Sequence, residues 1–255
     1  MQVLEANRGK AGSKLSILTQ LAQSLAQSGR RARATFLAQD CFLCGSAAGD
    51  ALLCAACTGD LPMLPAPNCP VCALPTPLAA VCGACLKTKP HFDATQARYR
   101  YGFPLDRLVQ ALKYRHSLAV SRFIAQAMLQ ALPPDAIDAD LMMALPLSER
   151  RLAERGFNQA LEIARPLAQH IGVPLLATGY VKSVDTAPQA SLPWKERQKN
   201  IRGAFECALD LSGKRIIVID DVMTTGATLN EFARTLKKHG ASQVSNWVVA
   251  RTIRD

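Results

Sequence analysis

The sequence predicts an α/β protein in which a parallel sheet follows a small cysteine-rich segment. Two observations support this prediction. Apolar runs typical of buried strands alternate with amphipathic helical patterns from residue 94 to residue 250, and eight of the nine cysteines lie between residues 41 and 85. Strands that alternate with helices indicate a parallel sheet with right-handed crossovers. The 255 residues, of which 49% are hydrophobic, suffice for one such domain and a small module.

Charge and hydropathy limit the class of ligand and the location. Thirty Lys and Arg against twenty Asp and Glu give a net charge of +10, which favours phosphorylated ligands, nucleic acid or an anionic membrane surface. No apolar run approaches the roughly 20 residues that a membrane helix needs. The N-terminal region also lacks the apolar core of a signal peptide. We therefore expect a cytoplasmic protein that is not integral to a membrane.

Residues 1–40 form a basic leader. Six cations stand against two acids in this stretch, and leucines at helical spacing predict one short helix that ends near Gly29. Two interpretations are open at this point. The leader is either a loosely ordered terminus, as termini commonly are, or an arm that binds nucleic acid.

Four Cys-x-x-Cys pairs follow within residues 41–90. Nine residues separate the two pairs of each half, and the halves repeat with a period of 28. Because one Cys-x-x-Cys turn aims two thiolates at a tetrahedral centre, two turns complete a closed four-thiolate zinc site. The pattern therefore predicts a double zinc ribbon with two structural Zn²⁺ ions. The predicted ligands are Cys41, Cys44, Cys54, Cys57, Cys69, Cys72, Cys82 and Cys85.

The partners of the four pairs are expected to be sequential. In this arrangement the first two pairs share one zinc and the last two pairs share the other; interleaved pairing is the alternative. Thioredoxin-like redox chemistry is a further alternative, although one pair would suffice for it. Metal binding is favoured over disulfides because a cytosolic chain meets a reducing environment.

The main domain is expected to span residues 91–255. Its first half predicts, in order, a strand at 94–101, helices at 105–112 and 120–131, a strand at 141–145, a helix at 157–171 and a strand at 173–177. Arg151 and Arg155 lie in a basic loop between the strand at 141–145 and the next helix. Such arginines are either solvated or placed to bind an anion.

Residues 180–205 are polar and basic, with little helical or strand periodicity. Loops of this length inside a compact domain are generally functional lids or disordered segments. The cations of this stretch would face an anionic ligand or, with Trp194 as a stacking platform, single-stranded nucleic acid. These are the four cations in the second half of the stretch, namely Lys195, Arg197, Lys199 and Arg202.

The densest set of signals lies at residues 216–229. A β-branched run at 216–219 predicts a strand buried on both faces, and Asp220 and Asp221 follow it as an acidic turn. Hydroxyls and Gly226 then open a helix that Gly240 ends, before a last strand at 244–250. Exposed amides at such a helix terminus bind anions, and paired carboxylates hold sugar hydroxyls with or without Mg²⁺. A sugar phosphate fits both the amides and the carboxylates. A plain capped helix without a ligand is the alternative.

The run VIDDVMTTGATL resembles the signature of the type I phosphoribosyltransferases. The resemblance implies a loop that cradles the 5'-phosphate of phosphoribosyl pyrophosphate (PRPP) and an acidic pair that contacts the ribose. It implies catalytic roles for Asp220 and Asp221, and pyrophosphate binding by Arg151 and Arg155. The residues implied to bind PRPP with Mg²⁺ are Asp220, Asp221, Thr224, Thr225, Gly226, Ala227 and Thr228.

Roughly residues 41–252 resemble the ComF (competence protein F) family. The matching stretches, in this order, are CPVCALP, ALKYRHS, PLSERRLAERGFNQA, DTAPQASLPWKERQKNIRGAF and VIDDVMTTGATL. The resemblance implies a double zinc ribbon fused to a type I phosphoribosyltransferase-like domain. It also implies a link to DNA uptake in bacteria, with single-stranded DNA and the uptake machinery at the inner membrane as candidate partners.

Two functions are compatible with these features. One is transfer of a phosphoribosyl group to an acceptor that the sequence does not identify. The other is a non-catalytic, single-stranded-DNA-binding competence accessory that uses the phosphate pocket as a sensor. Thr224 stands where the hypoxanthine and guanine salvage enzymes have an aspartate that assists proton transfer. Because threonine is not a general base near neutral pH, purine salvage is disfavoured, although PRPP binding is not.

Overall fold

The computed structural model describes residues 39–131, 137–184 and 201–253. They fall into two compact units, one ending at Asp60 and the other beginning at Leu61. The basic leader, as far as residue 38, and the cations Lys195, Arg197 and Lys199 lie outside the described residues. Within the described residues, no helix is both long enough and apolar enough to cross a membrane.

The smaller unit is built around the first four cysteines. Strands β1 (Gln39–Asp40) and β2 (Ala47–Gly49) pair antiparallel, and α2 (Ala55–Gly59) follows. The Sγ atom of Cys54 caps α2 by accepting a hydrogen bond from the backbone N–H of Cys57 at 3.5 Å. Elements this short bury little apolar surface, so a bound metal would supply much of the folding free energy.

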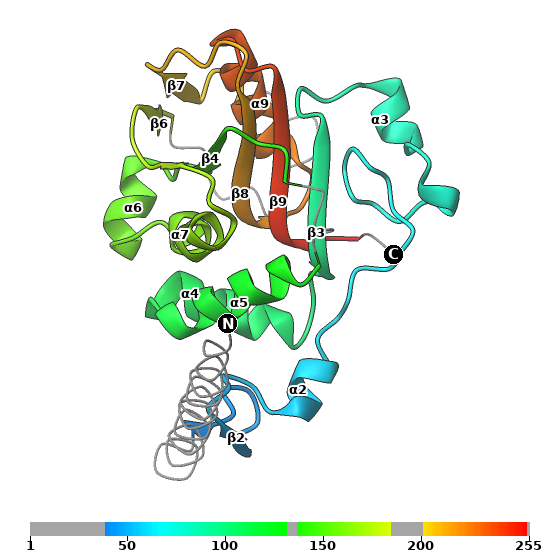
Figure 1. The fold of residues 1–255 in the computed structure, drawn as a ribbon, viewed down its shortest axis with the longest axis vertical. Coiled ribbons are helices and arrows are strands. Elements are labelled where there is room, and N and C mark those ends of the chain that lie inside the picture. Colours follow the sequence, from blue (N-terminus) through cyan, green and yellow to red (C-terminus); the bar gives the residue numbers. More distant parts are fainter. Residues whose placement is uncertain (1–38, 132–136, 185–200, 254–255) are drawn as a thin grey trace, which may run out of the picture. The chain divides into compact units, whose positions relative to one another are not determined.

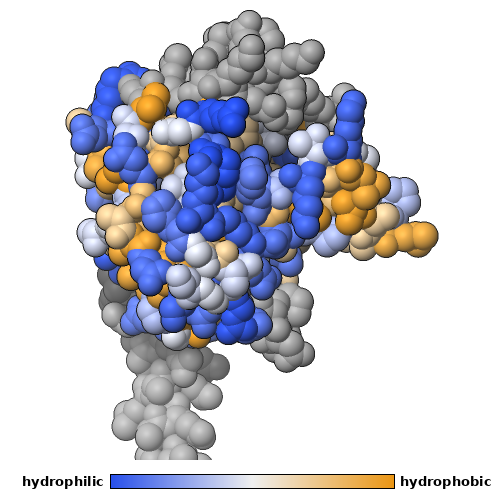
Figure 2. Space-filling view, turned by 90° about the horizontal axis from the view of Figure 1, so that it is seen from above, coloured by the Kyte–Doolittle hydropathy of each residue, from blue (hydrophilic) through white to orange (hydrophobic). Residues whose placement is uncertain are grey.

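The second group of four cysteines belongs to the larger unit. It includes the 3₁₀ turn η1 (Pro77–Ala79) and helix α3 (Gly83–Lys87). Cys69, Cys72 and Cys85 share one buried cluster with Phe92 of the following segment and with residues of the sheet. Leu78 and Leu86 of the same segment are exposed, and Figure 2 shows hydrophobic atoms gathered on a projecting part of an otherwise mainly hydrophilic face.

A five-stranded, all-parallel sheet forms the centre of the larger unit, which confirms the predicted fold class (Figure 1). The spatial order is β3-β9-β8-β4-β5. These strands are β3 (Ala94–Arg100), β4 (Leu141–Ala144), β5 (Leu175–Leu176), β8 (Arg215–Met223) and β9 (Gln243–Arg251). Its central strand β8 pairs with β4 on one edge and β9 on the other.

Helices cover the two faces of this sheet. The buried face of α9 (Ala227–Lys238) packs with Ile216 and Val218 of β8. The remaining helices are α4 (Leu105–Arg115), α5 (Leu118–Leu129), α6 (Glu149–Arg155) and α7 (Gln159–Ile171). Of these, α5 packs against α7, and α7 packs against β4 and β8. Helix α7 begins where the Asn158 side chain accepts a hydrogen bond from Ala160 N–H, and Gly172 ends it in the left-handed conformation.

Three local features differ from the sequence-based expectation. Strand β8 does not end at the aspartates but continues to Met223, because its ladder with β9 extends to the pair Met223 and Arg251. The basic loop contains the short helix α6. The polar stretch 180–205 begins and ends in a two-stranded antiparallel sheet, β6 (Tyr180–Lys182) and β7 (Phe205–Cys207).

Candidate functional site

The candidate site lies where the chain reverses its direction across the sheet. After β4 the chain passes through α6 and α7 to β5 on one side, whereas after β8 it passes through α9 to β9 on the other side. The carboxyl ends of β4 and β8 therefore form a topological switch point, the place where open parallel sheets bind ligands. The basic segment with Arg151 and Arg155 and the loop at residues 224–226 both begin at this edge.

The two aspartates of β8 have different surroundings. Successive side chains of a strand point to opposite faces of the sheet, and yet the two carboxylates still influence each other. Asp221 is buried, and its Oδ2 lies 2.9 Å from Nζ of Lys113 on α4. Asp220 is half-buried and accepts a hydrogen bond from the Asp221 backbone N–H at 2.8 Å. The sequence treated these residues as an equivalent pair, whereas within the described residues it is Asp221 that forms the close ion pair with Lys113.

The charges around the aspartates follow from this arrangement. Burial, and then the neighbouring Asp221 carboxylate, raise the pKa of Asp220 above its usual range. Burial favours the neutral amine of Lys113, yet the Asp221 carboxylate prevails and raises the pKa of that lysine. Asp221 therefore has a matched cation. A bound cation would stabilise the ionised form of Asp220. Carboxylate oxygens are ligands that Mg²⁺ prefers, so Asp220 suits that ion.

The loop after β8 presents backbone amides at the start of α9. Thr224 is exposed, Thr225 and Thr228 are half-buried, and Gly226 and Ala227 are buried. Gly226 has φ of +79°, and a Cβ there would lie 2.5 Å from Cε of Met223, so only glycine suits this position. Ala227 N–H donates to Thr225 Oγ1 at 3.3 Å. Within the described residues, the amides of Thr225, Gly226 and Thr228 donate to no other group.

The structure brings Arg155, but not Arg151, to the corner that holds Lys113. The Arg155 guanidinium lies 5.8 Å from the ring centre of Tyr114, next to Lys113, and its positive charge opposes protonation of that lysine. Its Nη1 donates to Gln159 Oε1 at 2.9 Å. Arg151 is half-buried one turn earlier in α6, and within the described residues it makes no contact with this group.

The C-terminal end of the polar stretch at residues 180–205 is attached to α9. The Gly203 N–H donates to Glu231 Oε1 at 2.6 Å, and Glu231 also pairs with Arg234. Arg202 is exposed, beside this attachment. Lys195, Arg197, Lys199 and Trp194 lie outside the described residues, so their predicted role as a lid stays a prediction.

Two residues on which the site depends, Lys113 and Arg251, were not predicted from the sequence. Lys113 falls within the stretch ALKYRHS, but nothing in a single sequence pairs it with Asp221. Arg251 ends β9, and its buried guanidinium donates to the carbonyls of Met223 and Thr224 just before the loop. The usable signal was the charge itself, since a cation at the end of an apolar strand is rarely buried without a partner.

The eight cysteines of the repeat form two groups of four. The sulfur atoms of each group lie within 4.8 Å of one another, and the groups are Cys41, Cys44, Cys54, Cys57 and Cys69, Cys72, Cys82, Cys85. Zn–S bonds of about 2.3 Å at tetrahedral angles require sulfur separations of about 3.8 Å. The Cys44 and Cys54 sulfurs are 3.7 Å apart, and those of Cys72 and Cys82 are 3.5 Å apart. The sequential partners are confirmed, and both groups fit structural Zn²⁺.

Backbone hydrogen bonds favour the thiolate form that zinc needs. Burial opposes ionisation of Cys41, but N–H groups of Cys44 and Cys54 lower the pKa of this thiol to about 6. Burial likewise opposes ionisation of Cys69, whose pKa is lowered to about 7 by N–H groups of Cys82 and Cys72. Thiolates are the metal-binding form of cysteine, so the first residue of each group is prepared for a cation.

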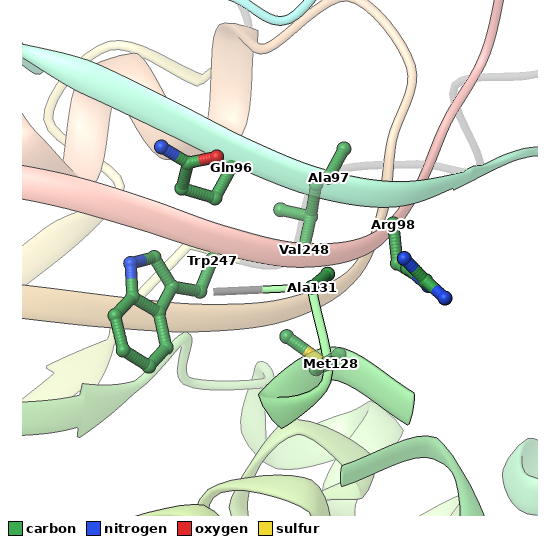
Figure 3. A pocket seen from close by; sticks show the side chains of 7 residues that line it. All are labelled: Gln96, Ala97, Arg98, Met128, Ala131, Trp247 and Val248. Atoms are coloured by element: carbon green, nitrogen blue, oxygen red, sulfur yellow. The ribbon is translucent and has the colours of Figure 1, made fainter. Parts of the chain in front are cut away.

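A small cavity elsewhere in the larger unit lies outside the candidate site. It lies between β3, β9 and α5, is lined by Arg98, Trp247 and Met128 among others, and has a volume of about 40 Å³ (Figure 3).

The ion pair between Lys113 and Asp221 should contribute measurably to stability. Lys113→Met leaves a buried carboxylate without its cation, and we expect a loss on the order of 3 kcal/mol in the free energy of unfolding, measured by urea denaturation. Lys237→Met is the matched control, because Lys237 Nζ pairs with the more exposed Asp93 at 2.7 Å and its loss should cost less than about 1 kcal/mol. Equal losses of unfolding free energy in Lys113→Met and Lys237→Met would contradict this prediction. So would a Lys113→Met/Asp221→Asn double variant that is no more stable than Lys113→Met alone.

Two family matches agree with the loop at the start of α9 and with the two groups of cysteines. Residues 158–254 match the phosphoribosyl transferase domain family, which covers the loop at residues 224–228. Residues 33–86 match the double zinc ribbon domain family, which covers both groups of four cysteines.

Three curated relatives resemble the chain over long stretches. DNA utilization protein YhgH of Salmonella typhimurium is 32% identical over 176 residues, which cover 67% of this chain and 78% of the relative. Competence protein F of Haemophilus influenzae is 30% identical over 182 residues, covering 66% of this chain and 77% of the relative. Competence protein ComFC of Bacillus subtilis is 35% identical over 118 residues, covering 44% of this chain and 45% of the relative. The chain therefore belongs to the ComF (competence protein F) family.

Proposed function

We propose that this protein binds PRPP together with Mg²⁺ at the carboxyl ends of β4 and β8, as a phosphoribosyltransferase-type protein. The observation that supports this most strongly is the group of amides at Thr225, Gly226 and Thr228, at the start of α9, which have no acceptor among the described residues. Such amides, together with the positive end of the helix dipole, favour a phosphate group. The place is the switch point of the sheet, and Asp220 lies at its edge, where the ammonium of Lys113 is shared with Asp221.

In this proposal each residue has a distinct task. The amides at residues 225–228 and the Thr225 and Thr228 hydroxyls hold the 5'-phosphate, while Asp220 accepts from the ribose hydroxyls. Asp221 does not touch the sugar but holds Lys113, whose ammonium then faces the pyrophosphate beside Arg155. Mg²⁺, held by Asp220 and ligand oxygens, would neutralise part of the pyrophosphate charge.

Phosphoribosyl transfer breaks the bond between ribose C1 and a pyrophosphate oxygen, and the leaving group takes the electron pair. A nitrogen atom of the acceptor forms the new bond to C1. Positive charge develops on the ribose carbon and negative charge on the pyrophosphate, so Asp220 near the sugar and Lys113 with Arg155 near the leaving group have the required signs. Thr224 is exposed and is no general base, which argues against a purine acceptor that must lose a proton to the protein.

A second candidate function is binding of single-stranded DNA, with the phosphate pocket as a sensor. The names of the relatives point to DNA utilization and competence, and the net charge of +10 favours a polyanion. Both candidates place the protein in the cytoplasm, where reduced thiols can bind zinc. In the second candidate the partners would be single-stranded DNA and the uptake machinery at the inner membrane.

Titration calorimetry with PRPP and Mg²⁺ tests the first candidate. Wild type should bind one PRPP per chain, and Asp220→Asn should weaken binding about 10-fold or more, because a hydrogen bond to a charged group is worth about 1.5–3 kcal/mol. Glu206→Gln removes an exposed carboxylate from β7 and serves as the control with unchanged affinity. No heat from wild type, or equal affinities for Asp220→Asn and wild type, would refute the proposal.

Titration of labelled single-stranded DNA at 50 and 200 mM salt tests the second candidate. If about four phosphates are contacted, affinity should fall on the order of 50-fold between these concentrations, because bound counterions are released. Replacing Arg30, Arg31 and Arg33 by alanine should flatten this dependence while leaving PRPP affinity intact. Binding that is insensitive to salt, or unchanged by the triple replacement, would exclude the basic leader as a nucleic-acid arm.

A further inference from the structure

Arg251, the last residue of β9, joins two segments that are far apart in the sequence. Arg251 is only 4% exposed. The Nε donates to the carbonyl of Cys72 at 2.9 Å. The Nη1 donates to the carbonyls of Met223 at 3.0 Å, Thr252 at 2.9 Å and Thr224. One buried guanidinium therefore bonds both the second cysteine group and the backbone at Met223 and Thr224, where the loop at the start of α9 begins.

The cysteine end of this connection would be held by zinc. Cys72 belongs to the second group of four, with its sulfur 3.5 Å from that of Cys82, so a bound Zn²⁺ would fix the Cys72 backbone. Four thiolates around one Zn²⁺ leave a net charge of about −2. A buried guanidinium next to this group offsets part of the charge, which explains how Arg251 is tolerated in the interior.

The loop end leaves little room for adjustment. Met223 and Thr224, whose carbonyls accept from Arg251, directly precede Thr225 and Gly226. Gly226 is packed so closely that an added Cβ would lie 2.5 Å from Met223 Cε and 3.7 Å from Phe92 Cζ. A shift of the Met223 backbone would therefore move the amides at residues 225–228.

We propose that Arg251 is a positioning residue that couples the second zinc site to the loop at residues 224–228, so that zinc in this site sets the geometry of the loop amides. The choice of PRPP as the ligand rests on the proposed function, but the coupling itself does not. The first zinc site belongs to the other compact unit and serves as the control.

Amide hydrogen exchange of the ligand-free protein tests the coupling directly. Two hydrogen-bonded amides lie next to the loop. Asn230 N–H donates to Gly226 O at 2.8 Å, and Thr252 N–H donates to Met223 O at 3.0 Å. Cys82→Ser should lose one of two zinc ions by elemental analysis and speed exchange of both amides on the order of tenfold. Cys44→Ser should also lose one zinc ion but leave both amides unchanged. Unchanged exchange in Cys82→Ser would overturn the proposal.

A double-variant cycle shows whether the coupling passes through Arg251. Arg251→Met should speed exchange at Asn230 and Thr252 like Cys82→Ser, and the combined variant should add little, since one connection is broken only once. If the combined variant instead raises the exchange rate by the product of the two single-variant factors, other contacts carry the coupling and the role of Arg251 is overturned. The Met142 amide, which donates to Pro174 O at 2.8 Å, reports global unfolding in each variant. If Arg251→Met unfolds globally, Arg251→Lys takes its place, since it keeps the positive charge but cannot bond both segments.

Calorimetry then separates this inference from the proposed function. If wild type binds PRPP, Cys82→Ser should weaken binding by a factor similar to the change in exchange, and Cys44→Ser should not. If wild type does not bind PRPP while the exchange pattern holds, the proposed function fails and the coupling stands. If PRPP binds equally to wild type and Cys82→Ser, the coupling does not reach the ligand and the inference fails.

Discussion

The pairing of β8 between β4 and β9 is the constraint on which the rest of this structure depends. Its ladder with β9 continues past both aspartates to the pair Met223 and Arg251. This continuation fixes Asp220 and Asp221 on opposite faces of the sheet and directs Asp221 to Lys113. It also places the loop at residues 224–226 directly at the switch point, where the chain turns into α9.

The same ladder explains why the second zinc ribbon is part of the larger unit. Arg251 can reach both Met223 and Cys72 only because β9 ends beside the last residue of β8. Phe92 and Met223 then bury the cysteines of the second group in a common core. The second group of cysteines thus shares the core of the larger unit, whereas the first group belongs to the other unit.

Much of the fold was predictable because its signals are local. The β-branched run before Asp220, the helical stripe of α9 and the repeat of 28 residues among the cysteines depend on near neighbours in the sequence. The sheet and the sequential cysteine partners follow from them. The pairs Lys113 with Asp221 and Arg251 with Cys72 were not predictable, because each joins residues more than 100 positions apart. The end of β8 was placed too early because two aspartates resemble a turn, whereas the long ladder with β9 keeps them in the strand.

The central claim is that the amides at the start of α9 hold the phosphate of a sugar phosphate. Two-dimensional ¹H–¹⁵N NMR of the labelled protein, titrated with ribose 5-phosphate alone, measures this at the level of single amides. Our account predicts saturable shifts of the Thr225, Gly226 and Thr228 resonances, while the Ala160 amide at the start of α7, already bonded to Asn158, stays in place. Saturable shifts confined to α7, or none at the start of α9, would contradict it.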